Sequence, residues 1–281
     1  MVKLIVSCLM ITLSSCEKEL SLNLPDDSGE LVVEGWIEQG KSPHIILSLS
    51  APYFSFIDSS NIRDFAVLRA KVTVTDGTQT EILTLKPNSV YFPPYYYFGT
   101  ELFGEANTSY TLIIENQGKR YYSSTTIPNL VVPDSVWFEK TNQGDTSGLL
   151  RLKFTDNPLI NNYYRIQTKR LGKDDQFVST LTSVISDKLF NGEQLTISLY
   201  RGESNVLELS GDHTYSVGDT IVLRFSSIDK NSYNFWHTLQ ENRISSANPF
   251  VASEIKVTSN ILGGLGSWCG YASAYDTVIA K

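Results

Sequence analysis

Three histidines and one cysteine are the side chains best suited by type to metal binding or nucleophilic catalysis. His44, His213 and His237 lie far apart in the sequence, and no two His or Cys residues have the spacing of a metal-binding motif. Cys269 has apolar neighbours, whereas a nucleophilic thiol needs surroundings that lower its pKa. We therefore expect structural histidines, an inert buried thiol, no metal and no cofactor.

The local motifs of hydrolases are also missing from the sequence. No Gly-x-Ser-x-Gly marks a nucleophile elbow, and the pair Asp174-Asp175 lacks the alternating ligands and glycine of a calcium loop. The glycines of residues 263–266 lack the Lys-Ser/Thr of a phosphate loop, so we expect them to pack against the helix or the other domain. We predict a protein that is not an enzyme, with no catalytic residue to name. Carboxylates distant in sequence can still meet in space, so an enzyme of unrecognised type stays the third hypothesis.

The first sixteen residues resemble a secretory signal that ends in a lipid-attachment site. Lys3 precedes an apolar run, Leu4 to Leu13, that is too short to span a bilayer. Leu13-Ser14-Ser15-Cys16 resembles a bacterial lipobox, whose Cys becomes the acylated N-terminus. We expect residues 1–16 to be a lipoprotein signal peptide with Cys16 lipidated, and residues 17–29 to be a flexible tether. An ordinary signal peptide with a chance Cys is the alternative.

The composition predicts a packed chain that does not bind nucleic acid. Hydrophobic residues make up 41% of the 281 residues, which is enough for a core. The formal net charge is −7, and no cluster of Lys and Arg is present for nucleic acid or anionic lipid to bind. With Cys8 in the signal and Cys16 lipidated, Cys269 has no partner for an internal disulfide, so burial must stabilise the fold.

Alternation of apolar and polar residues predicts strands throughout the chain. Residues 31–37, 71–75 and 110–114 show period-two patterns. Turn residues separate such segments, as at Asp76-Gly77 and Asn116-Gln117-Gly118. We therefore predict an all-β fold of β-sandwich-like units.

Two domains and one helix are expected from the order of these segments. The strand spacing favours an immunoglobulin- or fibronectin-like sandwich over residues 30–130 and a second β-rich domain over residues 131–281, with prolines between them. After Asp229, aromatic and aliphatic residues fall near helical spacing. This predicts one short helix at about 230–246 in the second domain.

An aromatic segment at residues 91–98 is the candidate binding surface. Pro93 and Pro94 exclude a regular central strand, so we expect a loop or a sheet edge. Tyr offers a rigid ring with a polar tip, which suits contact with a receptor or a sugar ring. In the alternative interpretation, half of these rings pack between the domains. The candidate binding residues are Tyr91, Phe92, Tyr95, Tyr96, Tyr97 and Phe98.

Several segments taken together resemble the DUF4249 family, lipoproteins of Bacteroidota whose role is unknown. The resemblance covers nearly the whole mature chain and transfers a role to Cys16 alone. Members are often encoded beside TonB-dependent outer-membrane receptors, which implies such a receptor as a partner. The segments are Leu31–Ile37, Asp156–Pro158, Asn162–Ile166, Phe190–Gly192, Gly218–Asp219, Tyr233–Trp236, Asn248–Phe250 and Ser259–Gly266.

Two smaller features resemble those of exported Bacteroidota proteins. Glu17-Lys18-Glu19 resembles a signal for display at the cell surface, with a solvated tether as the equal alternative. Ser135, Thr220 and Thr277 each follow Asp and precede an aliphatic residue, as in O-glycosylation acceptors. We expect a lipid anchor in the outer membrane, and surface exposure stays open.

The combined features predict a non-catalytic outer-membrane lipoprotein. Its expected role is that of an accessory or binding subunit of a TonB-dependent receptor uptake complex, with a glycan or a peptide as cargo. The alternative is a free-standing surface lipoprotein that binds glycans or mediates adhesion.

Overall fold

The computed structural model describes residues 29–51, 61–202, 213–246 and 255–281. This part holds one α-helix, α2 (Lys230–Ser246), and two short 3-10 helices, η1 (Ile62–Phe65) and η2 (Asp187–Leu189). The all-β prediction is confirmed, and α2 spans the residues for which the sequence predicts a helix. The strands are β1 (Leu31–Glu38), β2 (His44–Leu49), β3 (Lys71–Thr75), β4 (Thr80–Ile82), β5 (Thr84–Pro87), β6 (Tyr95–Phe98), β7 (Thr108–Asn116), β8 (Lys119–Ile127), β9 (Ser135–Lys140), β10 (Ser147–Thr155), β11 (Tyr163–Arg170), β12 (Val178–Ser186), β13 (Gln194–Leu199), β14 (Tyr215–Ser216), β15 (Thr220–Ile228) and β16 (Leu265–Ile279).

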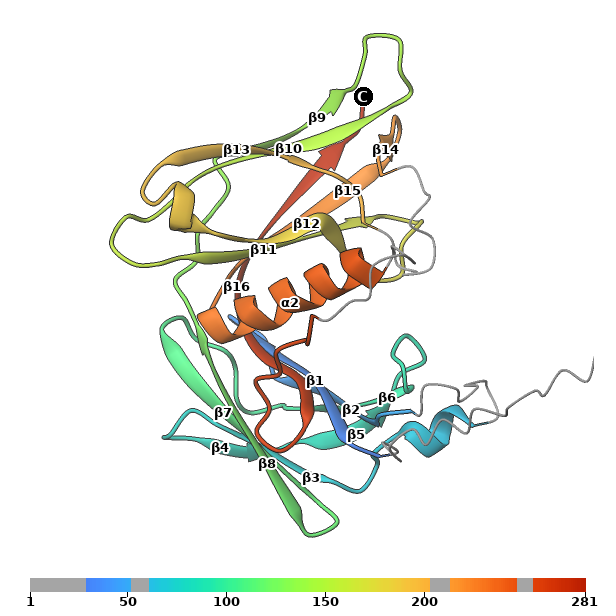
Figure 1. Ribbon diagram of the computed structural model, residues 1–281, viewed down its shortest axis with the longest axis vertical. Coiled ribbons are helices and arrows are strands. Elements are labelled where there is room, and N and C mark those ends of the chain that lie inside the picture. Colours follow the sequence, from blue (N-terminus) through green and yellow to red (C-terminus); the bar gives the residue numbers. More distant parts are fainter. Residues whose placement is uncertain (1–28, 52–60, 203–212, 247–254) are drawn as a thin grey trace, which may run out of the picture.

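Three sheets form two sandwiches that share one sheet (Figure 1). The largest sheet, in the order β12-β11-β15-β16-β1-β2-β6-β5, runs through both halves of the chain. The sheet β4-β3-β7-β8 packs on its N-terminal part, and we call this pair the N-terminal sandwich. The sheet β13-β10-β14, extended by β9 beside β10, packs on the other part and forms the C-terminal sandwich.

The turn between β7 and β8 shows how local sequence sets the strand register. Asn116 pairs with Lys119, which leaves a two-residue loop of Gln117 and Gly118. Both loop residues have positive φ, +49° and +78°, and a two-residue hairpin of type I′ needs positive φ at both positions. The Asn-Gln-Gly signal therefore produces the hairpin that the sequence predicts.

The strand β16 connects the two sandwiches. Its first residues pair in parallel with β1. This pairing runs from Leu265 beside Val32 to Tyr271 beside Glu38. From Tyr271 to Ile279 it pairs in antiparallel fashion with β15. One continuous strand thus lies in both sandwiches, although all of it falls within the range 131–281 expected for the second domain.

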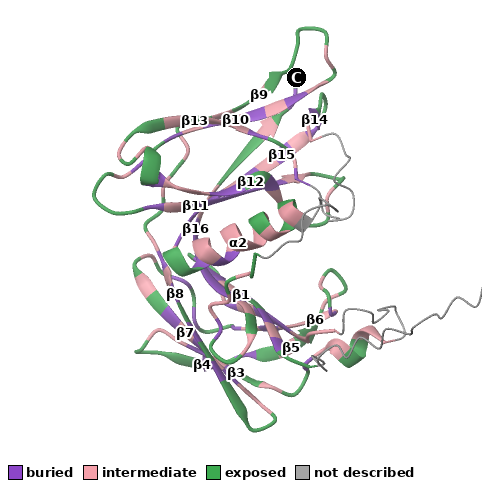
Figure 2. Ribbon diagram, in the orientation of Figure 1, coloured by how far each residue is buried: buried purple, intermediate pink, exposed green. Residues whose placement is uncertain are grey.

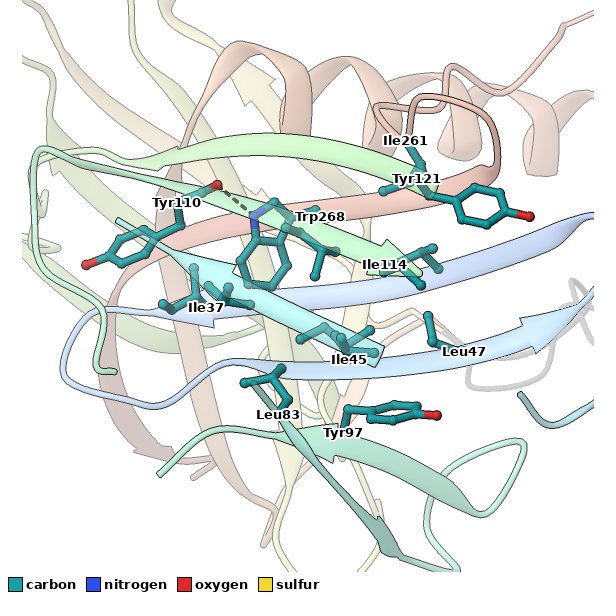
Figure 3. Close-up of a cluster of buried hydrophobic side chains, with 14 of the residues drawn as sticks. Ile37, Ile45, Leu47, Leu83, Tyr97, Tyr110, Ile114, Tyr121, Ile261 and Trp268 are labelled. Atoms are coloured by element: carbon teal, nitrogen blue, oxygen red, sulfur yellow. Dashed lines mark hydrogen bonds between the residues drawn. The ribbon is translucent and has the colours of Figure 1, made fainter. Parts of the chain in front are cut away.

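Trp268 of β16 lies at the centre of the N-terminal core (Figure 3). Its side chain is completely buried, and its indole Nε1 donates a hydrogen bond to the Tyr110 carbonyl at 2.9 Å. Gly35 on β1 makes room for the ring, because a Cβ at that position would lie 2.9 Å from Trp268 Cε3. The last strand of the chain therefore fills a core built mostly from the first hundred residues.

The glycine-rich loop before β16 packs against the N-terminal sandwich. Leu262 and Tyr122 of β8 exchange two backbone hydrogen bonds, at 2.8 and 3.3 Å. A Cβ on Gly266 would lie 1.9 Å from the carbonyl oxygen of Val33. The glycines thus permit close backbone approach, in agreement with the structural role that the sequence predicts.

The helix α2 covers the outer face of the shared sheet, on the side away from both sandwich cores. Tyr233 and Trp236 pack there against a small buried cluster around Ile228 and Tyr271. Buried residues in Figure 2 follow the sandwich interiors and the sheet beneath this helix. In the described part of the chain, no helix is both long and apolar enough to cross a membrane.

Asp229 joins α2 to the N-terminal sandwich. Its Oδ1 accepts a hydrogen bond from the Ser232 amide at 2.7 Å, which caps the first turn of the helix. Its Oδ2 accepts hydrogen bonds from the Thr126 amide at 2.9 Å and from the Thr125 hydroxyl at 2.8 Å on β8. One carboxylate thereby fixes the helix against a strand about a hundred residues away.

Candidate functional site

The candidate site lies on the outer face of β1, β2 and β6, beside the part that α2 covers. Val33 and Ile37 of β1 point into the N-terminal core, so the alternating residues Glu34 and Trp36 point outward. The pairing of β1 with β2 and of β2 with β6 places further outward side chains next to them. Three neighbouring strands therefore present one continuous surface.

A row of aromatic rings crosses these strands. The rings of Trp36 and His44 are stacked, with centroids 5.5 Å apart and planes at 10°. His44 stacks in turn on Tyr96, at 5.4 Å and 7°, and Tyr96 contacts Phe98 at 5.7 Å. Each ring is only half-buried. We call Trp36, His44, Tyr96 and Phe98 the aromatic row.

The loop between β5 and β6 adds a fifth ring to this surface. Its backbone is closed by a hydrogen bond from the Asn88 amide to the Pro94 carbonyl at 3.0 Å. Tyr91 of this loop meets Trp36 at 6.2 Å and Tyr96 at 5.3 Å, both edge-on. Gln176 Nε2, from the segment between β11 and β12, donates to the Val90 carbonyl at 2.6 Å. The loop is therefore held from both sandwiches.

The structure divides the predicted aromatic segment between this surface and the core. Tyr91, Tyr96 and Phe98 lie on the surface described above. Tyr97 is 3% exposed and packs in the N-terminal core, where its hydroxyl donates to the Val67 carbonyl at 2.9 Å. Phe92 is exposed and Tyr95 half-buried, and neither has a ring contact with the aromatic row. Only part of the segment is thus brought together.

The expected loop or edge is present only in the first half of the segment. Pro93 and Pro94 lie in the loop, but Tyr95–Phe98 forms β6, which is hydrogen-bonded between β2 and β5. The expectation was wrong for these four residues, because both prolines precede the strand and leave its amides free to pair.

Glu34 is the charged group of this surface, and it stands two residues before Trp36. Its side chain is exposed, and among the described residues it has no hydrogen bond or ion pair. The surrounding protein partly removes water from the carboxyl and raises the pKa of Glu34, while the positive charges of Arg165 and Arg243 act in the opposite direction. Desolvation, together with the charges of Tyr96 and Glu34, also raises the pKa of Tyr91. A carboxylate without a hydrogen-bonded or ion-paired partner among the described residues therefore lies near the aromatic row.

Three ring polar groups on the same surface also have no protein partner in the described ranges. They are the Trp36 indole N–H and the hydroxyls of Tyr91 and Tyr96. None of them is among the buried polar atoms without a partner, so each is open to solvent. The surface thus offers one acceptor-only group, one donor-only group and two hydroxyls that do both.

A charged cluster continues the same face toward the C-terminal sandwich. Arg224 of β15 donates to Glu38 Oε2 of β1 at 2.9 Å, and Tyr275 of β16 donates to Glu38 Oε1 at 2.6 Å. Lys41 lies 3.0 Å from the same carboxylate. Burial opposes the lysine charge, but hydrogen bonds with Tyr275 and Glu38 raise the pKa of Lys41. These groups satisfy one another and connect β1 with β15.

The remaining predicted residues do not gather at this site. Ser135 and Thr277 are exposed on β9 and β16, and Thr220 is half-buried at the start of β15. Cys269 is completely buried, and burial raises the pKa of its thiol. Cys16, the expected signal peptide and the expected tether up to residue 28 lie outside the described residues.

Of the histidines, only His44 lies on the aromatic row. His213 Nδ1 donates a hydrogen bond to the Arg201 carbonyl oxygen at 3.2 Å, and His237 lies 3.4 Å from Glu241 on α2. Within the ranges that the structure describes, no three His, Cys, Asp or Glu side chains are close enough together to hold a metal ion.

Sequence reasoning missed Glu34, Trp36 and His44 as site residues. The signal for them was the alternation of β1, which predicts that Glu34 and Trp36 share a face. Which distant segment covers that face depends on strand order, and the sequence pattern does not give strand order. His44 and Tyr96 meet only because β2 pairs with β6.

Comparison with known proteins identifies the family. No curated protein matches the sequence. The family model described as "Domain of unknown function (DUF4249)" matches residues 17–276, which is nearly the whole chain and includes Glu34, Tyr91 and the aromatic row. The chain therefore belongs to the DUF4249 family.

Proposed function

We propose that this chain is a lipid-anchored outer-membrane lipoprotein that binds a ligand without transforming it. The anchor is Cys16, at the end of a segment that resembles a lipoprotein signal. Two or more acyl chains hold a protein firmly on a membrane, whereas one chain binds only marginally. The folded part would then be presented at the envelope on the tether of residues 17–29.

The observation that carries the binding role is the surface of Glu34, Trp36, Tyr91 and Tyr96. Half-exposed rings from separate strands converge there with polar groups that no described residue satisfies. Aromatic side chains with free polar tips are typical of contact surfaces. The neighbouring charged cluster, by contrast, is internally paired, which suits a structural role.

The partner that we propose is a TonB-dependent receptor, with this chain as a non-catalytic accessory subunit of an uptake complex. Support comes from the lipobox-like segment and from what membership of this family implies for lipoproteins of Bacteroidota. In the alternative, a free-standing adhesion or glycan-binding lipoprotein, the same anchor is present but no receptor is bound.

Membrane fractionation and co-purification test this proposal. The full chain, extracted in mild detergent, is expected to co-purify with a β-barrel receptor, and Cys16→Ser is expected to leave the membrane fraction. Cys8→Ser is the matched control and is expected to behave as the parent. Firm sedimentation of Cys16→Ser with membranes would contradict the anchor, and a purified chain without any receptor would contradict the accessory role.

A further inference from the structure

We propose that the surface formed by Glu34, Trp36, Tyr91 and Tyr96 binds a neutral carbohydrate through one of its sugar rings. This inference rests on the proposed binding function and names the chemical class of the ligand. It concerns the described residues of β1, β6 and the loop before β6.

The first argument is the combination of hydrogen-bonding groups. The Glu34 carboxylate only accepts, the Trp36 indole N–H only donates, and the hydroxyls of Tyr91 and Tyr96 do both. A ligand that satisfies all of them must carry donors and acceptors close together. Sugar hydroxyls have both properties on adjacent carbons, whereas a simple ammonium only donates and a carboxylate or phosphate only accepts.

The second argument is the charge around the site. Arg165 and Arg243 act electrostatically on Glu34, and Lys86 Nζ lies 3.9 Å from the centre of the Phe98 ring at the other end of the aromatic row. These positive charges disfavour a cationic ligand, which aromatic rings would otherwise attract. The Glu34 carboxylate disfavours an anionic ligand. The local field therefore favours an uncharged ligand.

The third argument separates a sugar from an extended peptide. Peptides that bind sheets commonly add a strand to an edge with free backbone groups. Here β1 is paired with both β16 and β2, and β6 is paired with both β2 and β5. The backbone of these strands is therefore already occupied, and the site offers side chains only. Ring faces and polar tips suit the apolar C–H surface and hydroxyl rim of a sugar.

A glycan array followed by titration calorimetry tests the inference. The full chain in detergent is applied to neutral hexose and N-acetylhexosamine oligosaccharides, to oligosaccharides that contain uronic acid, and to a peptide array. We expect binding to neutral glycans, and at least tenfold weaker binding by Trp36→Ala and by Glu34→Gln. Trp137→Ala is the matched control for Trp36→Ala, because this exposed ring lies on β9, in a different sheet from the site. It is expected to bind within about twofold of the parent.

Folding is checked in the same preparations. Glu34→Gln removes a charge that makes no hydrogen bond in the described part, so its melting temperature is expected to stay at or above that of the parent. Loss of binding with retained stability supports a direct role. The inference would be overturned if the parent protein bound only peptides or bound no glycan. It would also be overturned if the Trp36 and Glu34 variants bound a glycan with the same affinity as the parent. If a receptor still co-purifies in any of these cases, the accessory proposal stands while the carbohydrate proposal fails.

Discussion

Replacement of Trp268 by Ala is expected to destabilise both sandwiches together. The indole is completely buried in the N-terminal core, and removal of such a ring costs about 3–5 kcal/mol. Loss of its hydrogen bond to the Tyr110 carbonyl adds about 1 kcal/mol. A total of about 4–6 kcal/mol is a large part of the stability of most proteins, roughly 5–15 kcal/mol. For a chain of this size it lowers the melting temperature by roughly 7–12 °C.

Thermal unfolding and amide hydrogen exchange measure this effect. Exchange is followed in peptides from β7, in the N-terminal sandwich, and from β10, in the C-terminal sandwich. Because β16 runs through both, we expect Trp268→Ala to reduce protection in both peptides and to give a single transition.

Trp137→Ala is the matched control for this measurement. Trp137 lies on β9 and is 37% exposed, so its replacement is expected to change the stability by less than about 1 kcal/mol. Two separate transitions, with β10 as well protected as in the parent, would show that the sandwiches are independent and would refute the reasoning.

Three further predictions follow from single side chains. Asp229→Ala removes a helix cap and two hydrogen bonds to β8, and is expected to lower the free energy of unfolding by about 1–3 kcal/mol in urea titration; an unchanged midpoint would contradict this. Burial alone would raise the pKa of Asp174, but hydrogen bonds from Arg170 lower it below its ordinary value. Ionised Asp174 therefore stabilises the folded protein above the unfolded pKa of about 3.9, and this contribution is lost as the pH falls through the folded pKa. Asp174→Asn is expected to lose stability at pH 6 and to show less acid sensitivity, as measured by melting temperature against pH. Burial lowers the pKa of His44, so the contribution of neutral His44 to stability is complete above about pH 6.5 and declines as the pH falls toward the folded pKa. His44→Phe is expected to make melting temperature less dependent on pH in this range. An unchanged slope of melting temperature against pH would argue against it.

Local patterns in the sequence predicted most elements correctly but not their partners. The alternation of β1, the Gln117-Gly118 turn and the spacing of α2 depend on neighbouring residues, so the sequence contains them directly. The parallel pairing of β1 with β16 joins residues more than two hundred positions apart. No local pattern encodes that contact, and the shared sheet was therefore not expected.

The candidate site shows the same division. Tyr91 and Tyr96 stood out because aromatic residues are concentrated in one short segment. Trp36 and Glu34 could not be recognised in the sequence as site residues, because their role depends on the β5–β6 loop that approaches them. Tyr97 could not be separated from its neighbours until the register of β6 placed it on the inner face.

The pairing of β1 with β16, more than two hundred residues later in the chain, has a consequence for biogenesis. Synthesis proceeds from the N-terminus, and domains usually fold in that order. Here β1 is synthesised long before β16, so it lacks this neighbour until residues 265–279 have been made. During that interval the edge of β1 is open to pairing with other chains, which is an aggregation hazard. A premature stop codon before residue 265 would leave this edge permanently unprotected, so such truncated chains are expected to be degraded.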